Sequence, residues 1–272
     1  MKNKIHIYSI SALLAVLVLT FMRSVSLISC YDTHIGYFNS SLLVTITNLS
    51  TFLAVVWLMS SAFVVQKNTT SAPIVFSKIY NHIATQIAAA IYLISSIYIL
   101  LDAENNLVVF AGASALISAI YYILMSINKP AISTITAFLS MLPTVTLALT
   151  AISVYFDMKI SMNSPHKVMA SFILLCAMIF SLCETRSHIN RATPRIHFAL
   201  GLVTFLLGFT YSAGNVIYLL TQSFSDFEKR PLTLGNIGFI GITSAISIYA
   251  FFRCLSFEIV SQPKEEKEQS IN

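Results

Sequence analysis

Charged side chains are scarce in this chain, since Asp, Glu, Lys and Arg make up 10% of its 272 residues against about 25% in soluble domains. Apolar residues make up 56% instead of about 45–50%. They gather in blocks of about twenty, which is the length that a helix needs to cross the hydrocarbon core of a bilayer. The composition therefore excludes an ordinary soluble domain.

Other absences narrow the class further. The four cysteines are too few and too scattered for a disulfide framework, and they form no C-x-x-C pair. The strand-like alternation of a membrane barrel is absent. The net charge is +5, but no basic patch interleaved with aromatic residues is present, so we expect no nucleic-acid partner. Because backbone groups in lipid must be bonded within their own segment, the apolar blocks should be helices.

Eight apolar blocks predict an all-α, polytopic transmembrane bundle that forms a single domain over residues 1–257. The spans are expected near residues 5–28, 41–65, 79–101, 107–127, 131–156, 168–183, 198–221 and 232–257. Pro143 lies inside the fifth block and predicts a kink there, because proline removes a backbone hydrogen bond. Residues 258–272 are polar and are expected to form a cytoplasmic tail.

The basic residues predict the orientation. If the N-terminus is cytoplasmic, most of the sixteen Lys and Arg residues fall in cytoplasmic segments, as the positive-inside rule requires. The opposite orientation fits that rule badly. We therefore expect the protein to lie in the plasma membrane with both of its termini in the cytoplasm.

Carboxylates are absent from the interior of every predicted span. Proton-coupled carriers depend on ionisable residues within the membrane, so this absence argues against a proton-driven carrier. Glu184 and His188 follow the sixth predicted span and have helical spacing. With His197 they are either a metal site or part of an interfacial loop on the cytoplasmic side, and the absence of a zinc-binding spacing favours the loop. The sequence predicts no catalytic residue, no metal site and no cofactor.

Neutral hydroxyl residues recur in the second, fifth and seventh spans. They either join the helices to one another or line a polar path through the bundle. Hydroxyls are common in packed membrane helices, which favours the first interpretation.

The densest ionisable stretch follows the first apolar block and contains Arg23, Tyr31, Asp32 and His34. Arg23 lies about 27 Å along its helix at ~1.5 Å per residue, near the outer edge of the hydrocarbon core. Its stem could then extend toward the headgroups. Two interpretations stay open. The stretch is a membrane anchor with a structural ion pair, or Arg23 binds an anionic or amphipathic ligand between Tyr31 and Tyr37.

The same stretch carries a rival pattern. Residues 27–30 read Leu-Ile-Ser-Cys and look like a bacterial lipobox, which would make residues 1–29 a removable signal and Cys30 a lipidated N-terminus. A charge such as Arg23 just before the cleavage site is unusual for a signal peptide. We therefore expect these residues to be retained, and removal stays as the alternative.

Arg23, Tyr31-Asp32 and Gly36-Tyr37-Phe38, followed by a long second span, resemble a group of uncharacterised multi-pass membrane proteins of Gram-positive bacteria. The resemblance covers this stretch and the overall hydropathy. It implies a location in the bacterial plasma membrane, and it brings no activity and no catalytic residue.

The leading functional hypothesis is a permease-like protein that handles a small molecule or a lipid. The alternative is a non-catalytic scaffold or accessory subunit that packs against a partner membrane protein or a second copy of the chain. The lipid bilayer surrounds the protein in either case. An intramembrane enzyme would need ionisable residues that converge at one depth, and the sequence predicts no such convergence.

Overall fold

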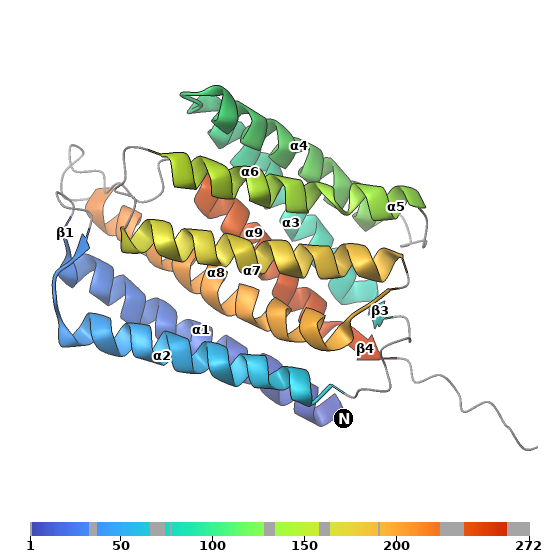
Figure 1. The fold of residues 1–272 in the computed structure, drawn as a ribbon, viewed down its shortest axis with the longest axis horizontal. Coiled ribbons are helices and arrows are strands. Elements are labelled where there is room, and N and C mark those ends of the chain that lie inside the picture. The colour runs from blue at the N-terminus through green and yellow to red at the C-terminus, as the bar shows by residue number, and fades with distance from the viewer. Residues whose placement is uncertain are drawn as a thin grey trace, which may run out of the picture.

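The computed structural model describes residues 2–32, 37–65, 74–76, 78–127, 134–157, 164–189, 191–223 and 237–259. Within these ranges, eight helices are long and apolar enough to cross a membrane, which confirms the predicted all-α polytopic bundle. The helices run roughly along one direction (Figure 1), and α1 begins at the end of the bundle where α9 ends.

The eight candidate spans contain α1 (Lys2–Cys30), α2 (Leu42–Met59), α3 (Lys78–Leu101), α4 (Asn106–Ile127), α6 (Leu142–Phe156), α7 (Pro165–His188), α8 (Pro194–Ser223) and α9 (Ile237–Leu255). The 3₁₀ segment η1 (Ser60–Phe63) extends α2, and the short helix α5 (Thr134–Leu139) precedes α6. The fifth span, Thr136–Phe156, includes most of α5 as well as α6, because α6 alone has 15 residues.

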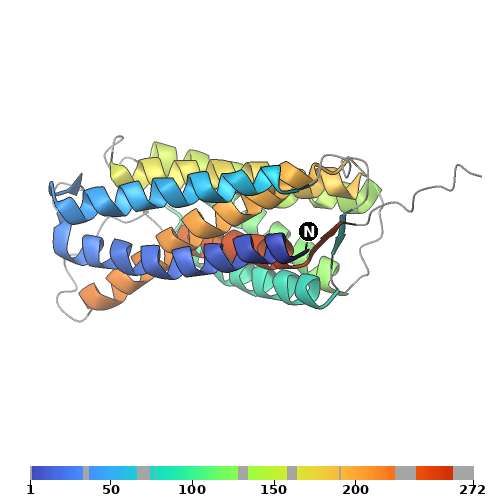
Figure 2. The same ribbon diagram turned by 90° about the horizontal axis from the view of Figure 1, so that it is seen from below.

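Two short antiparallel ladders mark the two ends of the bundle. Strand β1 (Tyr31–Asp32) pairs with β2 (Tyr37–Phe38), and β3 (Ile74–Phe76) pairs with β4 (Phe257–Ile259). We call the end with β1 and β2 the hairpin end. The opposite end, where α1 begins and α9 ends, is the terminal end (Figures 1 and 2).

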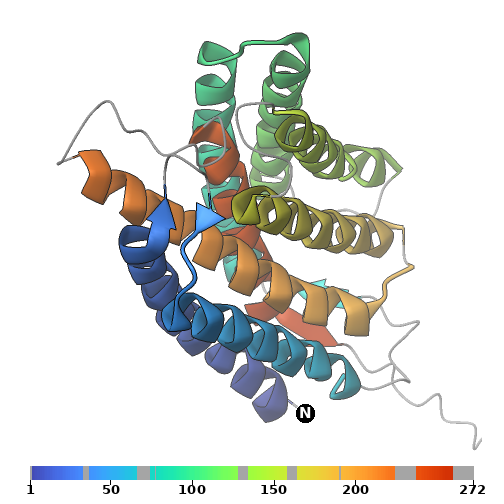
Figure 3. The same cartoon turned by 60° about the vertical axis from the view of Figure 1, so that its left-hand side comes forward.

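Helix α8 lies at the centre of the bundle, with α1, α2, α7 and α9 packed around it (Figure 3). Small residues at four-residue spacing let the helices approach closely. Ala111, Ala115 and Ala119 of α4 are fully buried. Gly208 of α8 faces Ser247 of α9 with no space for a Cβ atom.

The fifth predicted span is broken near Pro143. Helix α5 ends at Leu139 and α6 begins at Leu142, with Pro143 in its first turn, where the missing N–H costs least. Thr185 of α7 supports the break, since its hydroxyl oxygen lies 3.2 Å from the carbonyl oxygen of Ser140. The predicted kink is confirmed.

Hydroxyls of α6 join it to its neighbours. Thr146 is hydrogen-bonded to Ser118 of α4 at 2.8 Å, and Thr144 donates to Ser181 of α7 at 2.9 Å. These contacts confirm that the hydroxyls of this span connect helices.

Helix α7 extends beyond the predicted sixth span. Ser164 caps its N-terminus by accepting a hydrogen bond from the backbone N–H of Lys167. The helix continues past Cys183 to His188, although hydropathy falls after that cysteine. It continues because the charge of Glu184, one turn before the end of the helix, is paired with Arg253 inside the bundle.

Candidate functional site

Arg23 points into the bundle at the hairpin end. Its exposed fraction is 8%, and its guanidinium carbon lies 5.0 Å from the centroid of the Tyr211 ring of α8. The stem lies on Gly214, where an added Cβ would come within 3.2 Å of Arg23 Cδ. The expected extension toward the headgroups is therefore wrong, because the glycine leaves room for the stem between α1 and α8.

Aromatic rings cover the neighbours of Arg23. The ring centroid of His166, the second residue of α7, lies 4.6 Å from that of Tyr31 and 5.8 Å from that of Phe38. Tyr31 and Phe38 are register partners in the hairpin, so the hairpin closes this end of the bundle. Burial raises the pKa of Tyr31 to about 12, with smaller contributions from Tyr218 and Asp32. The Tyr31 hydroxyl therefore stays a neutral donor at neutral pH.

Several buried polar atoms at this end have no hydrogen-bond partner within the described part of the chain. They include Arg23 Nε, both ring nitrogens of His166, both polar amide atoms of Asn215 and the Tyr31 hydroxyl. His166 is 1% exposed and Asn215 is 0% exposed. Because an unpaired buried polar group costs about 1–3 kcal/mol, such a concentration indicates a place for bound molecules. We call Arg23, Tyr31, His166, Tyr211 and Asn215 the Arg23 site.

The structure brings two of the four predicted site residues to this place, Arg23 and Tyr31. Asp32 is half-buried and is the register partner of Tyr37 in the hairpin. His34 lies outside the described residues. Tyr37 was expected to line the ligand site but is half-buried in the hairpin. Phe38, the next residue, packs on His166 instead. Arg23 makes no hydrogen bond or ion pair with a described residue, and its one recorded polar contact is the Tyr211 ring.

Sequence reasoning missed His166, Tyr211 and Asn215. His166 lies in the polar stretch before the sixth predicted span, whereas Tyr211 and Asn215 lie among the other polar residues of the seventh. One signal was available: Tyr211 and Asn215 are four residues apart, so they share a face of their helix. Nothing in the sequence shows that this face meets Arg23.

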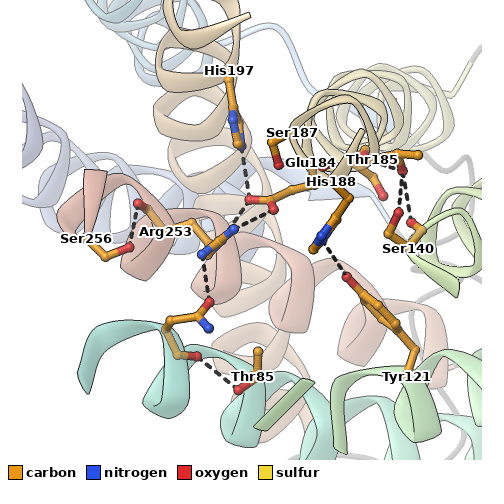
Figure 4. A network of polar contacts seen from close by, with 12 residues as sticks. Thr85, Tyr121, Ser140, Glu184, Thr185, Ser187, His188, His197, Arg253 and Ser256 are labelled. Atoms are coloured by element: carbon orange, nitrogen blue, oxygen red, sulfur yellow. Dashed lines mark hydrogen bonds and ion pairs between the residues drawn. The ribbon is translucent and has the colours of Figure 1, made fainter. Parts of the chain in front are cut away.

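A second polar cluster occupies the terminal end (Figure 4). Glu184 of α7 accepts two hydrogen bonds from Arg253 of α9, from Nε at 2.8 Å and from Nη2 at 2.7 Å. His197 Nε2 of α8 lies 3.0 Å from the same carboxylate. Arg253 Nη1 donates to Asn81 Oδ1 of α3 at 2.7 Å. All four side chains are buried, and we call them the Glu184 network.

A small pocket adjoins this network. Glu184, Ser140, Ser181, Tyr121 and Tyr249 are among the residues that line it, and it has room for about one water molecule. Near this pocket, the Tyr121 hydroxyl lies 3.5 Å from Nε2 of His188 (Figure 4). Because both Glu184 oxygens are bonded, the geometry is that of a clamp between helices and not of a free general base.

The Glu184 network overturns three expectations from the sequence. Glu184, His188 and His197 lie on α7 and α8 inside the bundle, and not in a cytoplasmic loop. A carboxylate does lie within a span, and ionisable residues do converge at one depth. Hydropathy counts each charge as if it were alone, whereas a charge bonded to partners inside the bundle is tolerated. Among the described residues, no three of the His, Cys, Asp and Glu side chains gather to hold a metal ion.

The fold and its two clusters define a multi-pass helical membrane protein with a bonded polar network at one end and an unsatisfied polar site at the other. His166 and Glu184, which mark these clusters on α7, are about 27 Å apart along the helix axis at ~1.5 Å per residue. Comparisons with protein-family models, with curated proteins and with solved structures found no match.

Proposed function

We propose that this chain is a permease-like protein of the bacterial plasma membrane that takes a small molecule or a lipid into its bundle at the Arg23 site. The observation that carries the proposal is the set of unpartnered buried polar atoms on α1, α7 and α8. A folded protein rarely leaves such groups without partners. A ligand that bonds to them would remove their desolvation cost.

The difference between the two ends supports this proposal. At the terminal end, the Glu184 network connects α3, α7, α8 and α9 through charged hydrogen bonds. At the hairpin end, a ladder of two residue pairs covers the Arg23 site, and a two-stranded hairpin is marginally stable by itself. The hairpin end therefore opens more easily. Under the orientation that the basic residues predict, a ligand enters from outside the cell.

The test is a binding screen followed by a flux measurement. A ligand that binds the folded state raises the midpoint of thermal unfolding. We expect at least one member of a panel of small solutes and lipids to stabilise the protein in detergent, and to cross vesicles that contain it. Asn215→Leu should lose both effects. The control Gln86→Ala, in an exposed pair with His82, should retain them. A panel without stabilisation or flux would refute the proposal.

A second candidate function, a scaffold for another membrane protein or for a second copy, is favoured by α2. Only 11% of its apolar window is buried within the bundle, against 78% for α8. Phe52 and Trp57 are among its exposed side chains. Such a face suits a protein partner. Co-purification of a stoichiometric partner that is lost in Phe52→Ala, with folding intact, would support it. A monomer without a partner would contradict it.

A further inference from the structure

Charge at the Arg23 site is unbalanced. Arg23 is the one formally charged residue of the five that form the site, and a guanidinium offers five N–H donors and no acceptor. Its one recorded contact with a polar or aromatic group in the described part of the chain is the face of the Tyr211 ring. A ring face attracts a cation, but it leaves the charge uncompensated. The missing partner is therefore an anion.

The shape of the donors restricts that anion. A guanidinium presents two parallel N–H groups that match the two oxygens of a carboxylate or phosphate. One buried positive charge balances one negative charge, whereas a phosphate dianion would bring a second charge, and Lys167, the cation that follows His166, already donates to the carbonyl oxygen of Asp157. Asn215 and His166 add neutral donors. The charge balance thus favours a monoanion, and its simplest planar form is a carboxylate.

The start of α7 adds to the preference for negative charge. His166 lies in the first turn of this 24-residue helix, and a helix N-terminus carries partial positive charge. The Ser164 side chain already accepts from the N–H of Lys167. The helix therefore contributes mainly through its field, while the hydrogen bonds come from the unpartnered side chains.

The walls of the site indicate what the anion is attached to. Tyr31, Phe38 and His166 pack ring against ring, and Tyr31 also lies edge-on to Tyr218, with centroids 6.1 Å apart. Aromatic faces cover apolar and aromatic bodies well. The geometry points to a ligand with one carboxylate on the Arg23 guanidinium, hydrogen bonds from Asn215 and His166, and an apolar or aromatic body against the hairpin rings. This inference rests on the proposed function and names its ligand class.

The experiment compares four probes on the purified full chain at pH 7. They are benzoate, decanoate, neutral benzamide and doubly charged phenyl phosphate, each measured by the shift in thermal unfolding and by ligand-observed NMR. We expect saturable binding of at least one carboxylate and at least tenfold weaker binding of benzamide and of phenyl phosphate. Decanoate distinguishes a lipid-derived carboxylate from a small aromatic one.

Two kinds of variant locate the binding. Arg23→Met should abolish carboxylate binding. Arg23→Lys keeps the charge but loses the two parallel N–H groups of the guanidinium, so it should weaken carboxylate binding at least tenfold. Gly214→Ala keeps the arginine and displaces its stem, because the added methyl would lie 3.2 Å from Arg23 Cδ. It should also weaken binding, and it provides the test if Arg23→Met fails to fold. Gln86→Ala should bind as the wild type does.

The outcomes separate the two proposals. If a neutral solute binds and depends on Asn215 while no carboxylate binds, the carboxylate inference is wrong and the proposed function stands. Tighter binding of phenyl phosphate than of benzoate would also overturn the inference. If no probe and no panel member binds, both proposals fail, and ordered water would then account for the unpartnered atoms.

Discussion

Two buried arginines offer a test in which one substitution should have opposite effects. Arg253 makes three hydrogen bonds, two with Glu184 and one with Asn81. Arg23 is also buried but makes a single cation–π contact among the described residues. Methionine retains most of the apolar stem of either side chain and removes the charge. We expect Arg253→Met to destabilise the protein and Arg23→Met, without ligand, to stabilise it.

The magnitudes follow from these contacts. Loss of one partner of a buried ion pair costs about 3–5 kcal/mol, because the other charge stays buried. For Arg253→Met this should lower the unfolding midpoint by roughly 10 °C, at about 2–4 °C per kcal/mol. An arginine at the centre of a membrane helix costs about 2.5–3.5 kcal/mol, which is an upper limit for Arg23 near the end of α1, and a desolvated cation–π contact returns about 2 kcal/mol. Arg23→Met should therefore add at most about 1 kcal/mol and raise the midpoint by at most roughly 2–4 °C.

The assay uses the cysteines of the chain. Cys176, Cys183 and Cys254 are buried, so a thiol-reactive fluorescent dye reports their exposure as the detergent-solubilised protein is heated. Cys30→Ser in all samples removes the half-buried thiol. The control Arg186→Met, at an exposed position of α7, should leave the midpoint unchanged. If Arg23→Met lowers the midpoint as much as Arg253→Met does, Arg23 is a structural anchor and the reasoning about the Arg23 site is refuted.

Three further predictions concern packing and charge. Glu184→Gln should lower the unfolding midpoint strongly, because it leaves the Arg253 charge without its partner. The double variant Glu184→Met with Arg253→Met should lower the midpoint less than either single methionine variant does. Additive losses in the double variant would contradict this prediction. Gly208→Ala should destabilise the packing of α8 on α9 because its methyl meets Ser247, and Ser247→Ala should restore part of the loss in unfolding measurements. Tyr31 has a pKa raised from 10.0 to about 12, so its contribution to stability should be complete below pH 10 and lost as the pH rises toward 12, a loss that Tyr31→Phe should remove from the pH profile of unfolding.

The spans could be predicted because the thickness of the bilayer sets their length. The end of α7 was missed because the drop in hydropathy at Glu184 looks the same whether the charge meets water or Arg253. The break before α6 could be predicted from Pro143 alone. Local covalent chemistry and the membrane thus determine much of the fold without knowledge of tertiary contacts.

The sites were only partly predictable. Arg23 and Tyr31 attracted notice because polar residues are dense in that stretch. His166 begins α7 beside Lys167, and Asn215 is one of several polar residues of α8, so whether the two meet depends on how each helix is rotated about its own axis. In a soluble protein, alternation between polar and apolar faces reveals that rotation. In a membrane, the interior and the lipid are both apolar, so the sequence shows little difference between the two faces.

The contrast between the two arginines bears on function more than either cluster alone. The bundle has the means to satisfy a buried arginine, since it supplies Arg253 with a carboxylate and an amide from two other helices. For Arg23 it supplies an aromatic face, and it leaves the polar side-chain atoms of His166 and Asn215 without a hydrogen-bond partner in the described part of the chain. Groups that cost stability and gain nothing from the fold are typical of sites where function requires them. The unsatisfied arginine is therefore the stronger indicator of a ligand site, while the better-bonded network, which resembles an active site more closely, serves to hold the helices together.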